Sequence, residues 1–218
     1  MAVIHNTTMT PGKLELLAAW LPAQPWYVGT GREPELARAG GFRLDDPAGE
    51  VGIEFMVVAD TSGDRPVSYQ VPMSYRGAPL DGADAALIGT PEHGVLGRRW
   101  IYDGAHDPVL VAQLLALVQG RAEAQHRNRS NTPEPSVSTH YTRADHPAMA
   151  GITSVGNGRD STDIVVTTET GESLTIAVTR VLRPVQDGGG AEGRVTARWR
   201  LPGGTEARGS FAVLRRSR

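Results

Sequence analysis

The sequence contains no cysteine, and this absence removes several kinds of site at once. Disulfides, thiolate nucleophiles and zinc sites built on cysteine are all excluded. Lysine is nearly absent too, because Lys13 is the only one in the 218 residues and the remaining counted bases are arginine. The net charge of −2 does not draw the chain as a whole to nucleic acid or to an anionic membrane. Neither is expected as a partner.

Other familiar signals are missing as well. The first residues, Met1–His5, lack the basic and then apolar pattern of a signal peptide, which predicts a cytoplasmic protein. The six histidines show no metal-ligand spacing, so we expect no metal and no cofactor. Charge is uneven, with 11 basic and 16 acidic residues in 1–136 against 11 and eight in 137–218. A polarity this modest is typical of solvated faces rather than of a binding surface.

The most informative positive feature is an apolar run, Val109–Val118, in which Gln113 is the only polar residue. Asp107 is a preferred N-cap and precedes a proline suited to the first helical position, while Gly120 is a plausible C-cap. A helix without a polar face is buried nearly all round. The sequence therefore predicts one buried core helix at about 107–119, wrapped by other elements, and too short to cross a bilayer.

The residues before this helix predict mostly strands. Ala2–Thr7 resembles an opening strand, and Thr10–Pro11 is typical of a helix start, because leucines then recur at helical spacing. Apolar residues alternate in two runs within residues 51–76, with a turn at Thr61–Asp64 between them, so a hairpin is expected.

Three details of this hairpin region carry further expectations. Glu54 belongs to the polar face of the first strand. Pro72 cannot donate to a ladder, which predicts an edge strand or a bulge in the second. Val95–Tyr102 predicts one more strand, followed by a turn at Asp103-Gly104.

After Gly120 the composition changes. Residues 121–138 are polar and predict a linker or a long loop. Residues 139–218 predict an almost all-β region, with a hairpin turn at Glu169–Glu172 and a flexible loop at Asp187–Gly190. The fold class is therefore α+β: curved antiparallel sheets with few helices and a nearly all-β second half. The predicted division is 1–120, 121–138 and 139–218, with two sheet-rich lobes.

Several segments resemble a known family. Trp20-Leu21-Pro22, followed by Trp26-Tyr27 and Gly29, resembles the opening of the N-terminal cap domain of actinobacterial maltokinases. The resemblance covers roughly 12–120, at the usual boundary error. The segment 94–103 is similar to stand-alone cap-like proteins of the same bacteria. Three further segments fit the cap: Tyr69-Gln70-Val71, Ala86–Gly89, and the turn and helix at Asp103–Val118.

In maltokinases the cap precedes a kinase domain that phosphorylates maltose with ATP. Ser130-Asn131-Thr132 and residues 154–183 resemble, more weakly, the N-lobe of such a domain. The third strand would need a lysine for the nucleotide phosphates, and Leu174–Val178 has none. No histidine has an aspartate two residues later, and the 218 residues contain neither a D-F-G-like motif nor a helical C-lobe. The residues therefore predict a non-catalytic protein with a region like a degenerate kinase N-lobe.

Two groups of residues are candidate ligand or partner sites, each with a simpler alternative. Arg98, Arg99, Trp100 and Asp103 together combine an aromatic with polar groups, as sugar sites do. A core strand with Arg99 paired to an acid is the interpretation that we favour. Asn157 and Arg159 flank a glycine in a loop able to form an anion nest, but a hairpin turn is favoured there. The stripe Arg194, Arg198 and Arg200 is able to bind an anion, although a solvated sheet face is favoured.

The resemblance implies an interaction or regulatory role linked to maltose, trehalose or glycogen metabolism. The expected partner is a separate kinase or another carbohydrate-metabolism enzyme, or a second copy of the chain. Exposed apolar surface is expected where a cap meets its partner. The alternative is a degenerate kinase-like protein that binds a nucleotide or a sugar.

Overall fold

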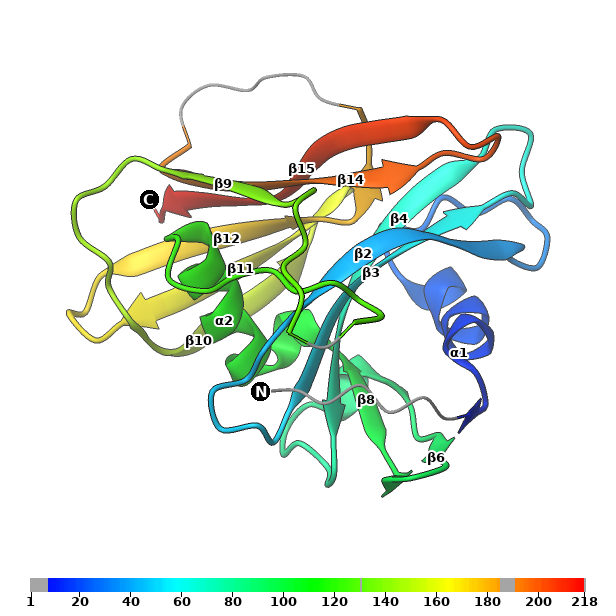
Figure 1. The fold of residues 1–218 in the computed structure, drawn as a ribbon, viewed down its shortest axis with the longest axis horizontal. Helices are drawn as coiled ribbons and strands as arrows, with labels where there is room; N and C mark the ends of the chain where they lie inside the picture. The colour runs from blue at the N-terminus through cyan, green and yellow to red at the C-terminus, as the bar shows by residue number, and fades with distance from the viewer. Residues whose placement is uncertain (1–7, 130, 185–190, 218) are drawn as a thin grey trace.

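The computed structural model describes residues 8–129, 131–184 and 191–217. The α+β prediction is confirmed: a long, curved antiparallel sheet wraps around one helix, and a second helix lies outside it (Figure 1). The predicted strand at 2–7 and the loop at 187–190 lie outside the described residues. In sheet order the main strands are β10 (Met149–Asn157), β11 (Ser161–Thr168), β12 (Ser173–Thr179), β15 (Glu206–Arg216), β14 (Gly193–Arg200), β2 (Leu36–Leu44), β3 (Gly52–Asp60), β4 (Val67–Arg76), β8 (Trp100–Asp103) and β5 (Leu87–Gly89).

Short elements complete the fold. Two more strands join the main sheet, and three form a small separate sheet. The additions to the main sheet are β9 (Ser138–Tyr141), which pairs with β14, and β13 (Val181–Leu182), which pairs with β4. The small sheet consists of β1 (Met9–Thr10), β6 (Glu92–His93) and β7 (Gly97–Arg98). The 3-10 turns are η1 (Leu21–Ala23), η2 (Asp84–Ala86) and η3 (Gly104–His106).

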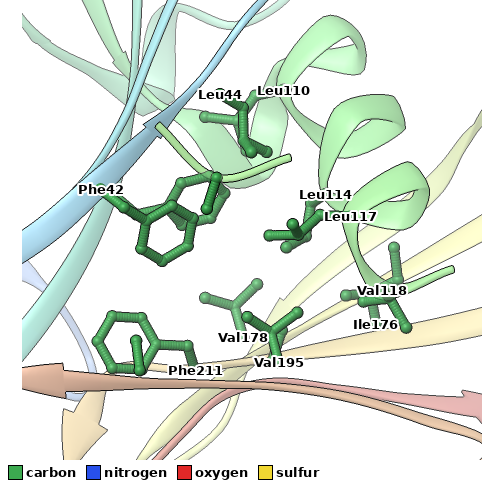
Figure 2. Packing of buried hydrophobic residues seen from close by; sticks show 14 of the residues in the cluster. Phe42, Leu44, Leu110, Leu114, Leu117, Val118, Ile176, Val178, Val195 and Phe211 are labelled. Atoms are coloured by element: carbon green, nitrogen blue, oxygen red, sulfur yellow. The ribbon is translucent and has the colours of Figure 1, made fainter. Parts of the chain in front are cut away.

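The core helix is α2 (Pro108–Val118), as the sequence predicts. The Asp107 side chain accepts a hydrogen bond from the N–H of Val109 at 2.9 Å, and Gly120 has φ +72°, as a C-terminal glycine cap requires. Figure 2 shows the helix packing against side chains from several strands, including Phe42, Ile176 and Phe211. Its buried residues are Leu110, Val111, Leu114, Leu115, Leu117 and Val118.

The outer helix is α1 (Lys13–Trp20), which begins two residues after Pro11, the predicted first helical residue. Gly12 is its N-cap, and the Glu15 carboxylate accepts a hydrogen bond from the N–H of Gly12 at 2.8 Å. Leu17 of this helix and the following Leu21 pack on the face of β3 and β4 that points away from α2, beside Met56, Val58, Tyr69 and Val71.

Because helices cover both faces there, β3 is buried on both sides, and the expected polar face at Glu54 is wrong. The carboxylate of Glu54 is held by the Lys13 ammonium at 2.5 Å and by the Tyr75 hydroxyl at 2.6 Å. Burial alone would raise the pKa of Glu54, but the charge and the hydrogen bond of Lys13 lower it below its ordinary value. The sole lysine of the chain therefore compensates a buried carboxylate.

The expectation that Pro72 marks an edge strand or a bulge is also wrong. β4 lies inside the sheet, with β3 on one side. Its other side is shared between β13, which pairs at Ser68 and Tyr69, and β8, which pairs from Met73 onward. Pro72 therefore occupies the gap between two short partners, where a missing N–H leaves no ladder bond unmade.

The predicted strand 95–102 is two strands in two sheets. β7 ends at Arg98 and pairs with β6, whereas β8 starts at Trp100 and pairs with β4. Arg99 lies between them, and its backbone N–H donates to the carbonyl of Pro91 at 2.9 Å rather than to the β4 ladder. The chain changes sheets at this residue.

The strands from the two halves of the chain form one sheet around one core. They meet where β14 pairs with β2 at Trp199 and Gly40, and where β13 pairs with β4. The backbones of β14 and β2 approach so closely that a Cβ on Gly40 would lie 3.2 Å from the Cα of Trp199. Residues 121–138 run back along β2, since Gln125 and Arg43 exchange backbone hydrogen bonds. The boundaries at 120 and 138 stay a prediction.

Candidate functional site

The structure separates Arg98 from Arg99. Arg98 lies opposite Glu92 in the β6–β7 hairpin, and the two side chains form an exposed ion pair at 3.1 Å. Arg99 instead donates from Nη2 to the carbonyl of Leu96 at 2.5 Å, and its buried Nε has no partner in the described part of the chain. The expected pairing of Arg99 with an acid is therefore wrong, because the hairpin register gives the acid to Arg98.

Trp100 lies in a small apolar cluster together with Tyr102. The Tyr102 hydroxyl accepts a hydrogen bond from the N–H of Leu80 at 2.9 Å. The ring is therefore held by the strand backbone at one end and by this hydrogen bond at its hydroxyl end. This agrees with the core interpretation of the Trp–Tyr strand rather than with an open sugar platform. The cluster also contains Leu80, Ala83, Ala86 and Leu87.

Asp103 is buried and forms an ion pair with Arg180, a residue that the sequence analysis did not select. Nη2 of Arg180 lies 2.8 and 2.6 Å from the two carboxylate oxygens, and the arginine side chain is fully buried. Its guanidinium also lies 5.0 Å from the ring centroid of Trp26. Arg180 follows Thr179 and precedes Val181-Leu182, so a charge directly before an apolar pair is the only signal in the sequence that indicates it.

The same arginine connects the two predicted groups. Its Nε donates to the Thr162 hydroxyl at 2.7 Å, and that hydroxyl donates to the side-chain oxygen of Asn157 at 2.6 Å. A continuous chain of hydrogen bonds thus runs from Asp103 to Asn157. Arg159 is exposed in the turn between β10 and β11, where the N–H of Gly158 donates to the carbonyl of Ser161 at 2.7 Å. The hairpin-turn interpretation describes this loop.

A second arginine–aspartate pair lies nearby. Arg76 donates from Nε and Nη2 to the carboxylate of Asp107 at 2.6 and 2.7 Å. Burial alone would raise the pKa of Asp107, but the hydrogen bonds from Arg76 hold it below the ordinary value. Arg76 and Arg99 both line a cavity of about 390 Å³, together with Glu50, Val51, Gly77, Ala78 and Pro79.

The tip of the β6–β7 hairpin is the most apolar exposed feature. Val95 and Leu96 there are 61% and 44% exposed. Val28, at 48%, is the other exposed large apolar residue in the part of the chain that the structure describes. We call Val95, Leu96 and the flanking Glu92–Arg98 pair the hairpin-tip surface. It joins an apolar centre to a charged rim, which is the composition of protein-binding patches.

The buried carboxylates of Glu54, Asp103 and Asp107 are each held by a cation from another element. Within the described ranges, no cluster of three or more histidine, aspartate or glutamate side chains is placed to hold a metal ion. No described helix is long and apolar enough to span a membrane.

Comparison with protein-family models gives one finding. Residues 20–107 match the maltokinase N-terminal cap domain, a stretch that contains Trp26, the hairpin-tip surface and Asp103. No curated protein matches the chain.

Proposed function

Because residues 20–107 form a domain of the maltokinase N-terminal cap family, we propose that the protein is a non-catalytic interaction module that binds a kinase of carbohydrate metabolism on a separate chain. The family description names a cap at the N-terminus of a maltokinase, and this supports contact with a kinase domain as the proposed role. Maltose, trehalose or glycogen metabolism in the cytoplasm is the proposed setting.

The observation that carries the proposal is the hairpin-tip surface. Val95 and Leu96 are adjacent, exposed and inside the matched residues. Fully burying a leucine or valine side chain contributes about 1.5–3 kcal/mol, which corresponds to about a 10- to 100-fold change in dissociation constant. Contact with a partner over these two residues is therefore sufficient to make the tip a measurable part of an interface.

The test is binding of the purified chain to a purified maltose kinase, measured by biolayer interferometry. We expect Leu96→Asp to weaken binding at least about tenfold, since it places a charge in the apolar centre of the patch. Val28→Asp is the matched control, because Val28 is similarly exposed but lies outside the β6–β7 hairpin. Equal losses in both variants, or no binding by the unaltered chain, would contradict the proposal.

Two further outcomes would favour a different partner or a different function. A dimer in light scattering that Leu96→Asp dissociates would assign the tip to a second copy of the chain. A thermal shift with Mg-ATP that disappears in Arg159→Ala would favour the nucleotide-binding alternative. A ligand at a hundred times its dissociation constant adds about 2.7 kcal/mol, which is readily detected.

A further inference from the structure

A second candidate site lies where β14 meets β2. There the structure forms a groove of about 580 Å³, a size typical of small-molecule sites. Four arginines from three segments line it: Arg38 of β2, Arg127 of the segment that runs back along β2, and Arg198 and Arg200 of β14. Other lining residues are Ala39, Gly40, Gly41, His126, Glu134, Pro135, Ser136, Trp199 and Glu206.

The arginine stripe predicted on β14 is divided by this geometry. Arg198 and Arg200 line the groove, whereas Arg194 is not among its lining residues. Sequence alone had favoured a solvated face for all three, because nothing in the sequence indicated that Arg38 and Arg127 join two of them. The juxtaposition depends on the pairing of Trp199 with Gly40.

The positive charge of the groove is only partly compensated. Arg198 faces Glu206 at 3.6 Å, but both side chains are more than half exposed, and such pairs contribute little. Arg38 lies 3.8 Å from Glu54, a carboxylate already held by Lys13. No hydrogen bond or ion pair joins Arg200 to another side chain in the described ranges.

Arg127 is the most constrained of the four. Its Nη1 donates to the carbonyl of Gly40 at 3.4 Å, which turns the guanidinium toward the groove wall. Burial lowers the pKa of Arg127, and the positive charges of Arg38 and Arg200 lower it further. An anion in the groove would relieve this mutual repulsion.

We propose that the groove binds a small ligand through a phosphate group. Guanidinium groups donate in a planar fork that matches phosphate oxygens, and charge-assisted bonds of this type are strong. Four arginines against Glu134 and Glu206 leave the lining with an excess of positive charge. The groove shares no residue with the hairpin-tip surface, so this site is independent of the proposed function.

The experiment is isothermal titration with inorganic phosphate, pyrophosphate and glucose 6-phosphate, at constant ionic strength. Binding of at least one is expected, and the three separate a free phosphate from a phosphate ester. Arg127→Gln and Arg200→Gln are expected to weaken it at least tenfold each, and Arg200→Lys less than Arg200→Gln, because lysine keeps the charge without the fork. Arg183→Gln is the matched control, as Arg183 is exposed and does not line the groove.

Several outcomes would overturn the proposal, and thermal midpoints of the variants serve as the stability control. The site does not exist if none of the three ligands produces heat beyond a chloride control, or if Arg183→Gln loses as much affinity as Arg200→Gln. Unchanged thermal midpoints in the variants would show that the loss is local rather than a loss of fold. A duplex oligonucleotide that binds more tightly than pyrophosphate, with affinity increasing with length, would assign the groove to nucleic acid instead.

Discussion

Two arginines, Arg180 and Arg143, illustrate opposite uses of the same side chain. Arg143, whose own side chain is 10% exposed, binds three acids that remain in contact with water: Asp145, Glu172 and Glu192 at 2.7, 2.7 and 3.2 Å. Arg180 binds a single acid, Asp103, but both side chains are almost completely removed from water. The carboxylates around Arg143 keep 62%, 26% and 24% of their side-chain surface exposed.

The number of ion pairs is therefore a poor guide to importance. Around Arg143, water competes for every partner, and exposed pairs contribute about 0–1 kcal/mol each. Around Arg180, loss of one partner leaves a buried charge without compensation, which costs about 3–5 kcal/mol. Arg180 also lies between the two halves of the chain, since Asp103 and Trp26 come from the cap-family part and Thr162 from the second half.

The largest effect is expected at the buried pair. Asp103→Ala should destabilise the protein by about 3–5 kcal/mol, because the Arg180 guanidinium then remains buried without its counter-ion. Urea unfolding, followed by circular dichroism, measures the change. The double variant Asp103→Leu with Arg180→Met is the control, because replacing both partners by apolar groups is often neutral. A double variant no more stable than Asp103→Ala would indicate that shape rather than charge matters at this position.

An intermediate effect is expected at Asp107, whose partner Arg76 is partly exposed. Asp107→Asn keeps an oxygen for the helix cap but weakens the hydrogen bonds to a charged group, which contribute about 1.5–3 kcal/mol. The folded-state pKa of Asp107 lies below its ordinary 3.8, so the stabilisation is present above that pH and is lost as the pH falls through the folded value. The midpoint of thermal unfolding should fall with acid below about pH 4 more steeply in the unaltered protein than in Asp107→Asn. Parallel acid profiles would refute the assignment.

The smallest effect is expected at Arg143, because its acid partners remain in contact with water. Arg143→Ala should cost about 1 kcal/mol or less, and the difference from the unaltered protein should shrink as salt is raised. Thermal unfolding at about 0.05 M and 0.5 M sodium chloride measures both the loss of stability and its dependence on salt, since screening lengths shorten over that range. A loss as large as that at Asp103, or one insensitive to salt, would remove the contrast between the two arginines.

The sequence predicts the local elements well, because their causes are local. α2 could be predicted from its cap, its apolar run and its terminal glycine. The turns after β3 and after β11 could be predicted from small and polar residues between alternating runs. One of the errors concerns what covers a strand. Glu54 was expected on a polar face because nothing local indicates that α1 covers it.

The site was harder to predict, because its contacts join distant positions. Asp103 and Asn157 were both selected, but only Arg180 explains why they belong to one network. Arg198 and Arg200 were selected as a stripe, yet their neighbours Arg38 and Arg127 come from another strand and a loop. Pair partners across a sheet depend on register and strand order, and neither is encoded in a short window of sequence.

The pairing of β14 with β2 also constrains the order in which the chain folds. The strands β2, β3 and β4 pair as successive hairpins, as do β10, β11 and β12, whereas Trp199 and Gly40 are separated by most of the chain (Figure 1). Closing so long a loop costs conformational entropy before any contact offsets that cost. The single paired position between β14 and β2 contributes little free energy to offset it. The pairing of β14 with β2 is therefore expected to form last, after α2 has provided an apolar surface on which both groups of strands collapse. The groove of arginines takes residues from both β2 and β14, so it exists only once these two strands have paired.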